Sequence, residues 1–238
     1  MQPLSWTRRR LLLTAGALPF ALRGAAGSEA ACRNQSLDDA PPVDAAEALE
    51  RLKAGNQRFV EGRMQHPHEA ADWRKSLIKA QTPFATVLCC SDSRVPAELV
   101  FDEGLGDLFV VRVAGNIVDD DVAGSIQYGV LHLKIPLLVV LGHEGCGAVS
   151  ATLEAIDGAP KEPRYIEELV DLIKPGLKDL DPKLKGDERL AAAAQANVRW
   201  SMRRLLDMTG VLPTPDAKRF RLAGGVYEME TGRVRFTD

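Results

Sequence analysis

A cysteine, an aspartate and an arginine follow directly on an apolar stretch of the chain. Residues 84–89 form this stretch, and Cys90, Asp92 and Arg94 come after it at alternate positions. A thiolate is a soft metal ligand, and a guanidinium can hold a carboxylate through two parallel hydrogen bonds. The spacing therefore predicts a metal-binding thiol beside a carboxylate whose position depends on the arginine.

A histidine and a cysteine follow a second apolar stretch in the same manner. His143 and Cys146 come three positions apart after residues 137–142. If both stretches are parallel strands, their carboxyl ends lie at the same edge of a sheet, so that Cys90, His143 and Cys146 surround one point. Two thiolates and an imidazole suit zinc, and three protein ligands leave a fourth position for water, as in catalytic sites. We therefore expect one Zn²⁺ per chain.

The carboxylate of Asp92 and the guanidinium of Arg94 indicate that the expected zinc site is catalytic and not only structural. Water on zinc in a shielded pocket has a pKa close to 7, so that hydroxide is available at neutral pH. While Arg94 holds it, Asp92 stays off the metal and accepts a hydrogen bond that orients the hydroxide. If this ion pair breaks, Asp92 can take the fourth position and close the site.

Other cysteines and histidines are expected to have other roles. Neighbouring residues of a strand point to opposite faces, so Cys89 is expected to be a buried core thiol when Cys90 binds the metal. His66 and His68 flank a proline in a polar connection and are expected to face solvent. His132 lies within an apolar helical segment and is expected to be partly buried.

The first 30 residues are expected to be an export signal that is removed from the mature protein. Arginines at 8–10 precede the apolar run 11–22, and small residues follow from 24 to 31. The apolar run is too short to span a membrane, which takes about 20 residues, so no stable membrane insertion is expected. The arginine pair resembles a twin-arginine signal and predicts export of the folded protein to the periplasm or the exterior. An ordinary Sec signal is the alternative.

The rest of the chain is expected to form a short linker and one domain. Residues 31–42 contain two prolines and are assigned to the linker, which leaves residues 43–238 for a single hydrophobic core. The formal net charge is −3, and removal of the signal would leave a charge of −6. An acidic protein is a poor partner for phosphate backbones, so nucleic acid is not expected among its ligands.

Apolar runs alternate with helical segments, which predicts an α/β fold with a central, mainly parallel β-sheet flanked by helices. The expected strands and a last hairpin-like segment are 84–89, 108–113, 137–142, 220–226 and 233–237. The expected helices after the first strand are 122–133, 145–156, 165–180 and 188–208. Ahead of the sheet, helical segments at 43–61 and 68–80 form an N-terminal helical arm, which packs either on the sheet or on a second subunit.

The combination of the two motifs, 53 positions apart from Cys90 to His143, resembles the β-class carbonic anhydrases. The likeness extends from residue 56 to the C-terminus and is most specific in segments 90–96, 111–116 and 142–147. It implies reversible hydration of carbon dioxide to bicarbonate and a proton, in which zinc-bound hydroxide attacks CO2. It also implies a homodimer or homotetramer with sites at a dimer interface and N-terminal helices that wrap the partner.

The resemblance also assigns roles to single residues. It implies that Cys90, His143 and Cys146 bind the zinc, while Asp92 and Arg94 form the catalytic dyad.

Three further positions match the substrate pocket of the same family. Gln81 corresponds to a glutamine that donates a hydrogen bond to substrate or bicarbonate, and Phe109 and Tyr128 correspond to pocket walls. Their alternative roles are a turn residue for Gln81 and ordinary core for the two aromatic residues. Val87 stands where a bicarbonate-inhibited subgroup has tryptophan, so no such switch is expected.

Three other functions are compatible with parts of these patterns. A non-catalytic zinc protein would explain the ligands but not Asp92 and Arg94. A zinc hydrolase acting on carbon disulfide or carbonyl sulfide would use the same set of residues. A redox protein using Cys89 and Cys90 is disfavoured, because a disulfide between adjacent strand residues is strained.

Overall fold

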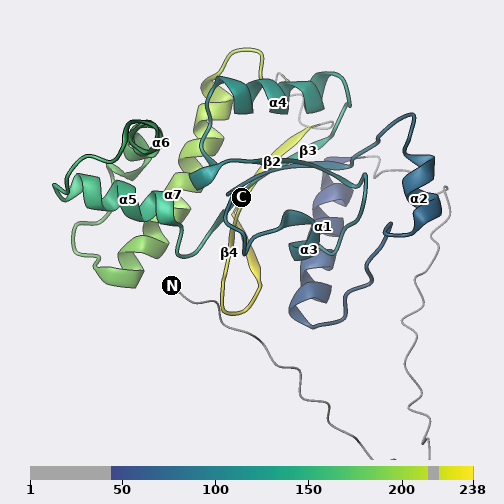
Figure 1. Cartoon of the computed structure of the whole chain (residues 1–238), viewed down its shortest axis with the longest axis horizontal. Helices are drawn as coiled ribbons and strands as arrows, with labels where there is room; N and C mark the ends of the chain where they lie inside the picture. Colours follow the sequence, from purple (N-terminus) through teal and green to yellow (C-terminus); the bar gives the residue numbers. More distant parts are fainter. Residues whose placement is uncertain (1–43, 214–219, 238) are drawn as a thin grey trace, which may run out of the picture. The chain divides into compact units, whose positions relative to one another are not determined.

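The computed structural model describes residues 44–213 and 220–237, and a five-stranded sheet in the order β2-β1-β3-β4-β5 lies at the centre of this part of the chain (Figure 1). The strands are β1 (Ala85–Cys89), β2 (Leu108–Arg112), β3 (Leu137–His143), β4 (Arg221–Tyr227) and β5 (Val234–Thr237). The pairs β1·β2, β1·β3 and β3·β4 are parallel, and β5 pairs antiparallel with β4. The predicted α/β class with a mainly parallel sheet is confirmed. The expected signal and linker, residues 1–30 and 31–42, lie outside the described residues.

Seven α-helices and two 3-10 turns surround this sheet in the described part of the chain. The helices are α1 (Ala45–Val60), α2 (Ala71–Ser76), α3 (Ala97–Val100), α4 (Asp120–Leu131), α5 (Gly147–Ile156), α6 (Arg164–Ile173) and α7 (Gly186–Asp207), and the turns are η1 (Ala114–Asn116) and η2 (Lys174–Leu177). The predicted helix 165–180 is wrong in its second half: Pro175 has no amide hydrogen for an α-helical bond, and a 3-10 turn replaces the helix there. No helix among the described residues is long and apolar enough to cross a membrane.

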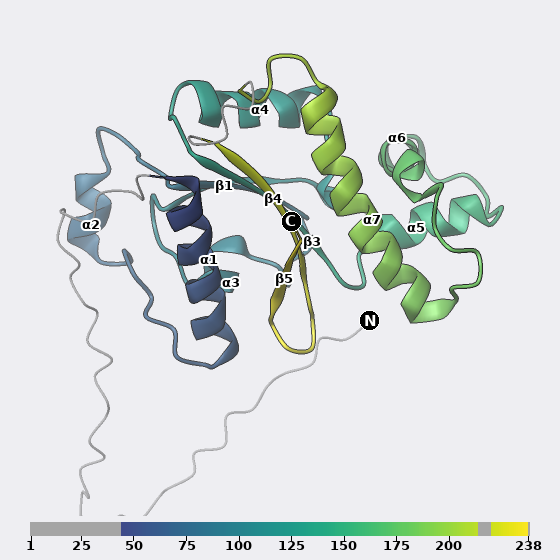
Figure 2. The ribbon, with the colours of Figure 1, turned by 180° about the vertical axis from the view of Figure 1, so that it is seen from behind.

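Both faces of the sheet are covered by helices, which can be followed in Figures 1 and 2. Val87 and Val139 belong to a core shared with α1 and α3, while Leu88 and Val140 belong to a second core shared with α4 and α7. This arrangement explains why β1 and β3 are continuous apolar runs, since side chains on both faces are removed from water. Packing on both faces therefore restrains the strands, and with them the side chains at the strand ends.

The first helix packs against the sheet of its own chain. Asp44 caps it by accepting hydrogen bonds from two backbone amides at 2.8 Å each, and Ala48, Leu49 and Leu52 on one side are buried in the first core. The side chain of Asn56 donates to backbone oxygens near α3 and β5 at 3.0 and 2.9 Å. Packing on the sheet is one of the two arrangements expected for this segment.

The predicted environments of His68 and His132 and the predicted length of the second helix were wrong. The expected helix 68–80 is only the six residues of α2. His68 is 7% exposed rather than in solvent, because its Nδ1 lies 2.7 Å from a carboxylate oxygen of Asp107 and its ring stacks on Trp73. His132 is exposed rather than partly buried, and its ring packs on Tyr128 with the centroids 4.9 Å apart.

Candidate metal centre

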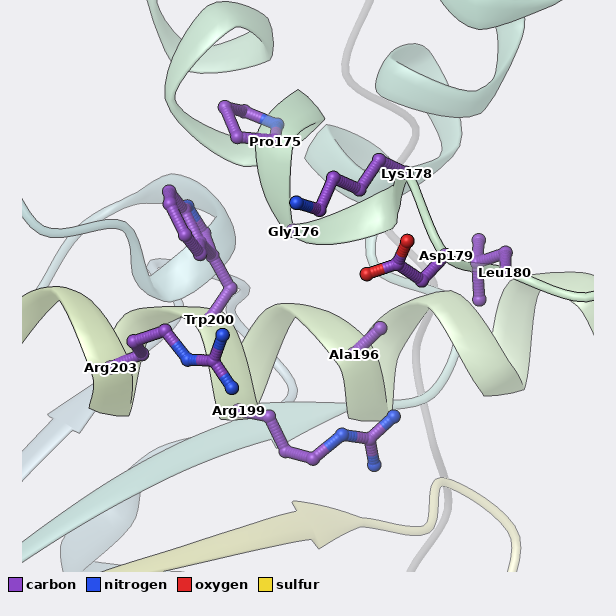
Figure 3. A pocket seen from close by; sticks show the side chains of 9 residues that line it. All are labelled: Pro175, Gly176, Lys178, Asp179, Leu180, Ala196, Arg199, Trp200 and Arg203. Atoms are coloured by element: carbon purple, nitrogen blue, oxygen red, sulfur yellow. The ribbon is translucent and has the colours of Figure 1, made fainter.

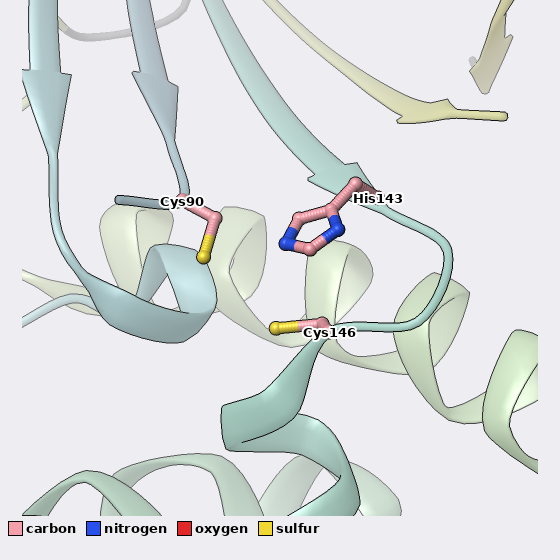
Figure 4. Close-up of side chains that lie close together, drawn as sticks. All are labelled: Cys90, His143 and Cys146. Atoms are coloured by element: carbon pink, nitrogen blue, oxygen red, sulfur yellow. The ribbon is translucent and has the colours of Figure 1, made fainter. Parts of the chain in front are cut away.

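Two cysteines and a histidine converge at the carboxyl ends of two neighbouring strands (Figure 4). Cys90 follows β1, His143 ends β3, and Cys146 immediately precedes α5. Their ligand atoms all lie within 4.8 Å of one another, and all three side chains are buried. The turn that returns the chain from β3 to α5 contains Gly145 with a φ of 64°, a conformation that favours glycine.

The imidazole offers a lone pair to this cluster. Its Nδ1 lies 2.8 Å from the backbone oxygen of Glu144, which can only accept, so in the neutral imidazole Nδ1 carries the proton and Nε2 carries the lone pair. Nε2 of His143 is buried and has no hydrogen-bond partner among the described residues. A buried polar atom of this kind costs free energy unless something binds it, and a metal ion facing the two sulfurs would do so.

The two thiols also fit a divalent cation. A hydrogen bond from the Cys146 thiol and hydrogen bonds from the backbone amides of Asp92 and Gly115 lower the pKa of Cys90 to about 4, despite burial. The pKa of Cys146 is raised, because its thiol donates to Cys90 and because it is buried. Without a cation, one thiolate is therefore stabilised at the expense of the second. A bound divalent ion removes this conflict by favouring both thiolates.

An ion pair lies beside these three ligands. Arg94 donates from Nε to Oδ1 of Asp92 at 2.9 Å and from Nη2 to Oδ2 at 2.8 Å, and its backbone amide also donates to Oδ1. These bonds hold the pKa of Asp92 well below its usual range. Oδ2 of Asp92 lies 3.9 Å from Nε2 of His143. An ionised acceptor is thus fixed next to the expected metal position.

Comparison with known proteins of similar sequence and fold identifies the family. A family model described as "Carbonic anhydrase" matches residues 85–234. Carbonic anhydrase 2 of Mycobacterium tuberculosis is 38% identical over 83% of this chain and 95% of the relative. The carbonic anhydrase of Mycolicibacterium smegmatis is 40% identical over 82% and 94%. Among solved structures, the β-carbonic anhydrase CcaA aligns with a TM-score of 0.65 and 27% identity over 81% of this chain and 88% of that one. The chain belongs to the β-carbonic anhydrase family. It is accordingly an enzyme of the carbonic anhydrase type.

One residue that contacts the site of this β-carbonic anhydrase received no role from the sequence. Arg112, the last residue of β2, donates from Nε to the backbone oxygen of Cys90 at 3.2 Å and from Nη2 to that of Asp92 at 2.7 Å. It therefore braces the loop that carries a metal ligand and the dyad carboxylate. Its sequence signals are its place in the matching segment 111–116 and at the end of an apolar run; in the structure it pairs in register with Cys89.

The three residues that resemble substrate-pocket residues of the family do not join the metal cluster within one chain. Phe109 pairs in register with Thr86, four residues before Cys90, which is about 13 Å along the strand. Tyr128 stacks against Phe109 with the ring centroids 6.3 Å apart and is 48% exposed. Gln81 is exposed and precedes β1, whose other end leads to Cys90. All three therefore lie near the amino ends of the strands, whereas the metal ligands lie at the carboxyl ends.

A separate pocket of about 200 Å³ lies between η2 and α7 (Figure 3). Its lining includes Lys178, Arg199, Arg203 and the indole of Trp200, but no thiol or imidazole. In Figure 3 the guanidinium of Arg199 points away from the amine of Lys178. The chemistry of this family member is therefore assigned to the thiol and imidazole cluster.

Proposed function

We propose that the protein catalyses the reversible hydration of carbon dioxide to bicarbonate and a proton, with one zinc ion held by Cys90, His143 and Cys146. The observation that carries this proposal is the convergence of two buried thiols and an unpartnered imidazole nitrogen beside an ion-paired carboxylate. A zinc ion at this position would act as a Lewis acid and lower the pKa of a water molecule toward neutrality.

The side chains around the ligands have complementary tasks in this reaction. Asp92 is held ionised by Arg94, so it acts as a hydrogen-bond acceptor that orients the nucleophile and does not store the released proton. Ile117 and Val149 belong to the same buried cluster as the cysteine ligands and exclude water from one side of the site. The proton formed in the hydration leaves to solvent or buffer.

We propose that the active form is a homodimer or homotetramer. The outer edge of β2 has no neighbouring strand among the described residues, and Tyr128 exposes 48% of its surface. An edge of this kind offers unpaired backbone groups to another chain. One solved chain aligns with a TM-score of 0.64 and 24% identity and comes from a study of two β-carbonic anhydrases of Sordaria macrospora that are described as tetrameric. In such an assembly Gln81, Phe109 and Tyr128 would line the partner's site, and sedimentation of the purified protein tests the proposal.

We also propose that residues 1–30 direct export of the folded protein to the periplasm or the exterior. The three arginines at 8–10 ahead of a short apolar run support a twin-arginine route. Fractionation of cells that express the wild type and the double variant Arg8→Lys, Arg9→Lys tests this proposal. Equal export of both proteins would favour the Sec alternative.

The activity itself is tested by stopped-flow measurement of carbon dioxide hydration with a pH indicator. Purified protein with one zinc per chain should accelerate the reaction far above the buffer rate, and removal of the zinc by a chelator should abolish the acceleration. The variant Asp92→Asn keeps the shape of the side chain without its charge and should bind zinc but turn over slowly. A zinc-loaded wild type without activity would instead be a non-catalytic zinc protein. Faster turnover of carbonyl sulfide or carbon disulfide would indicate the related hydrolase.

A further inference from the structure

The residue after the histidine ligand is anchored by the C-terminal hairpin formed by β4 and β5. The backbone amide of Glu144 donates to the oxygen of Tyr227 at 3.0 Å. Its carboxylate accepts from the backbone amide of Met229 at 3.3 Å and lies 3.4 Å from Nη2 of Arg235. The backbone oxygen of Glu144 in turn accepts the Nδ1 proton of His143. A chain of contacts therefore runs from β5 to the imidazole.

This anchoring matters because the peptide after His143 sets the orientation of the ring. The hydrogen bond to the Glu144 oxygen fixes both the tautomer and the rotation of the imidazole, so a shift of that peptide moves Nε2 relative to the two sulfurs. A Cβ atom at Gly145 or Gly147 would meet no other atom within 4 Å, so this side of the turn faces open space and no side chain holds it there.

Arg235 lies between two carboxylates, those of Glu144 and Glu228, and its charge helps to hold the Glu144 side chain in place. Nε of Arg235 lies 2.9 Å from a carboxylate oxygen of Glu228, and Nη2 lies 3.4 Å from Glu144, so one guanidinium serves two carboxylates. The arginine side chain is 47% exposed and that of Glu144 is 35% exposed. Ion pairs this open to solvent contribute little to fold stability. Their loss is expected to affect the orientation of the ligand rather than the folding of the domain.

We propose that Glu144 and Arg235 are positioning residues for His143, which makes the C-terminal hairpin part of the metal centre. This inference rests on the proposed zinc function and concerns residues that never touch the metal or the substrate. The sequence separates Glu144 from Arg235 by 91 positions, so only the folded chain brings them together.

The test is the zinc affinity of variants, measured by competition with a chromophoric chelator. Glu144→Ala and Arg235→Ala should each weaken zinc binding by about 10- to 100-fold, the range found when residues that hold metal ligands are removed. Glu144→Gln can still accept the Met229 amide but loses its charge, so it should have an intermediate affinity. Cobalt substituted for zinc should give a shifted visible absorption spectrum in the two alanine variants, because the ligand field depends on the imidazole orientation.

A matched control separates this effect from a general loss of stability. Arg189→Ala removes another partly exposed arginine, whose two bonds to Asp157 are 2.5 and 2.8 Å long; Asp157 caps the C-terminal end of α5, the end opposite Cys146. It should leave zinc affinity unchanged, and the melting temperatures of all metal-free variants should agree with its own. If Glu144→Ala does not fold, Glu144→Gln and Arg235→Ala carry the test.

The outcomes distinguish this inference from the proposed function. A wild type that binds zinc, together with alanine variants whose affinity and cobalt spectrum match it, would overturn the positioning role alone. A wild type that binds no zinc would overturn the proposed function, and with it this inference. Weakened zinc binding in Arg189→Ala to the same degree would show that the effect is not specific to the hairpin and would also overturn the inference.

Discussion

Replacement of Arg94 by alanine is expected to inactivate the enzyme by releasing Asp92. In the wild type, two guanidinium bonds of 2.9 and 2.8 Å hold the carboxylate, and the backbone amide of residue 94 holds only Oδ1. In Arg94→Ala, Oδ2 is free. It starts 3.9 Å from Nε2 of His143, so rotation of the side chain would bring it to a zinc ion held by the three ligands.

The size of the loss follows from the role of the carboxylate. A positioned group that orders a proton in the transition state contributes about 10²- to 10⁴-fold to the rate. Arg94 also lowers the pKa of Asp92, but without this effect the carboxyl returns toward its ordinary value of 3.8 and is still ionised at pH 8. The loss at pH 8 therefore comes from the position of Asp92 and not from its protonation. We expect kcat/KM to fall by about 10²- to 10⁴-fold while the zinc content stays at one per chain.

Stopped-flow hydration of carbon dioxide at pH 8, with zinc content measured on the same samples, is the assay for this prediction. Arg94→Lys is the matched control, because it keeps the positive charge but cannot form two parallel bonds to the carboxylate. It should retain more activity than the alanine variant and less than the wild type. Arg94→Ala with kcat/KM within twofold of the wild type and full zinc occupancy would refute the orienting role of the ion pair.

Three further predictions concern the loop, the core and the pH dependence of stability. Arg112→Ala removes the hydrogen bonds to the backbone oxygens of Cys90 and Asp92 and should lower both zinc affinity and kcat/KM. Unchanged values would show that the loop keeps its conformation without Arg112. Leu52 is fully buried, so Leu52→Ala should lower the free energy of unfolding in urea by about 2–5 kcal/mol, and a loss below 1 kcal/mol would contradict the packing. Burial raises the pKa of Glu103 from 4.5 to about 7, so this group stabilises the fold below pH 4.5 and its contribution is lost as the pH rises through 7. Between pH 5 and 8 the stability of the wild type should therefore fall more steeply than that of Glu103→Gln, and equal pH slopes would contradict this assignment.

The sheet and the ligand cluster could be predicted because both leave local signals in the sequence. Residues 84–89 and 137–142 are continuous apolar runs, which is how strands covered on both faces appear in a sequence. The residue types that follow them allowed Cys90, His143 and Cys146 to be grouped before any coordinates, and the structure brings them within 4.8 Å.

Contacts between distant residues leave no such signal. His68 was expected in solvent because its neighbours are polar, but its partner Asp107 lies 39 positions away and buries it. Arg112 and Arg235 act on backbone or side-chain oxygens 20 to 91 positions away, and no periodic pattern marks either residue. The placement of Phe109 required the strand register, because four residues along a strand decide whether a side chain reaches the site.

Zinc X-ray absorption spectroscopy of the purified wild type tests most directly whether Cys90, His143 and Cys146 form an open metal centre. Three protein ligands predict one zinc per chain with two sulfur atoms at about 2.3 Å, one imidazole nitrogen at about 2.0–2.1 Å and one further light atom. A decrease from two sulfur neighbours to one in Cys146→Ser would assign that ligand. A wild-type spectrum without two sulfur neighbours, or a purified protein that takes up no zinc, would contradict the account.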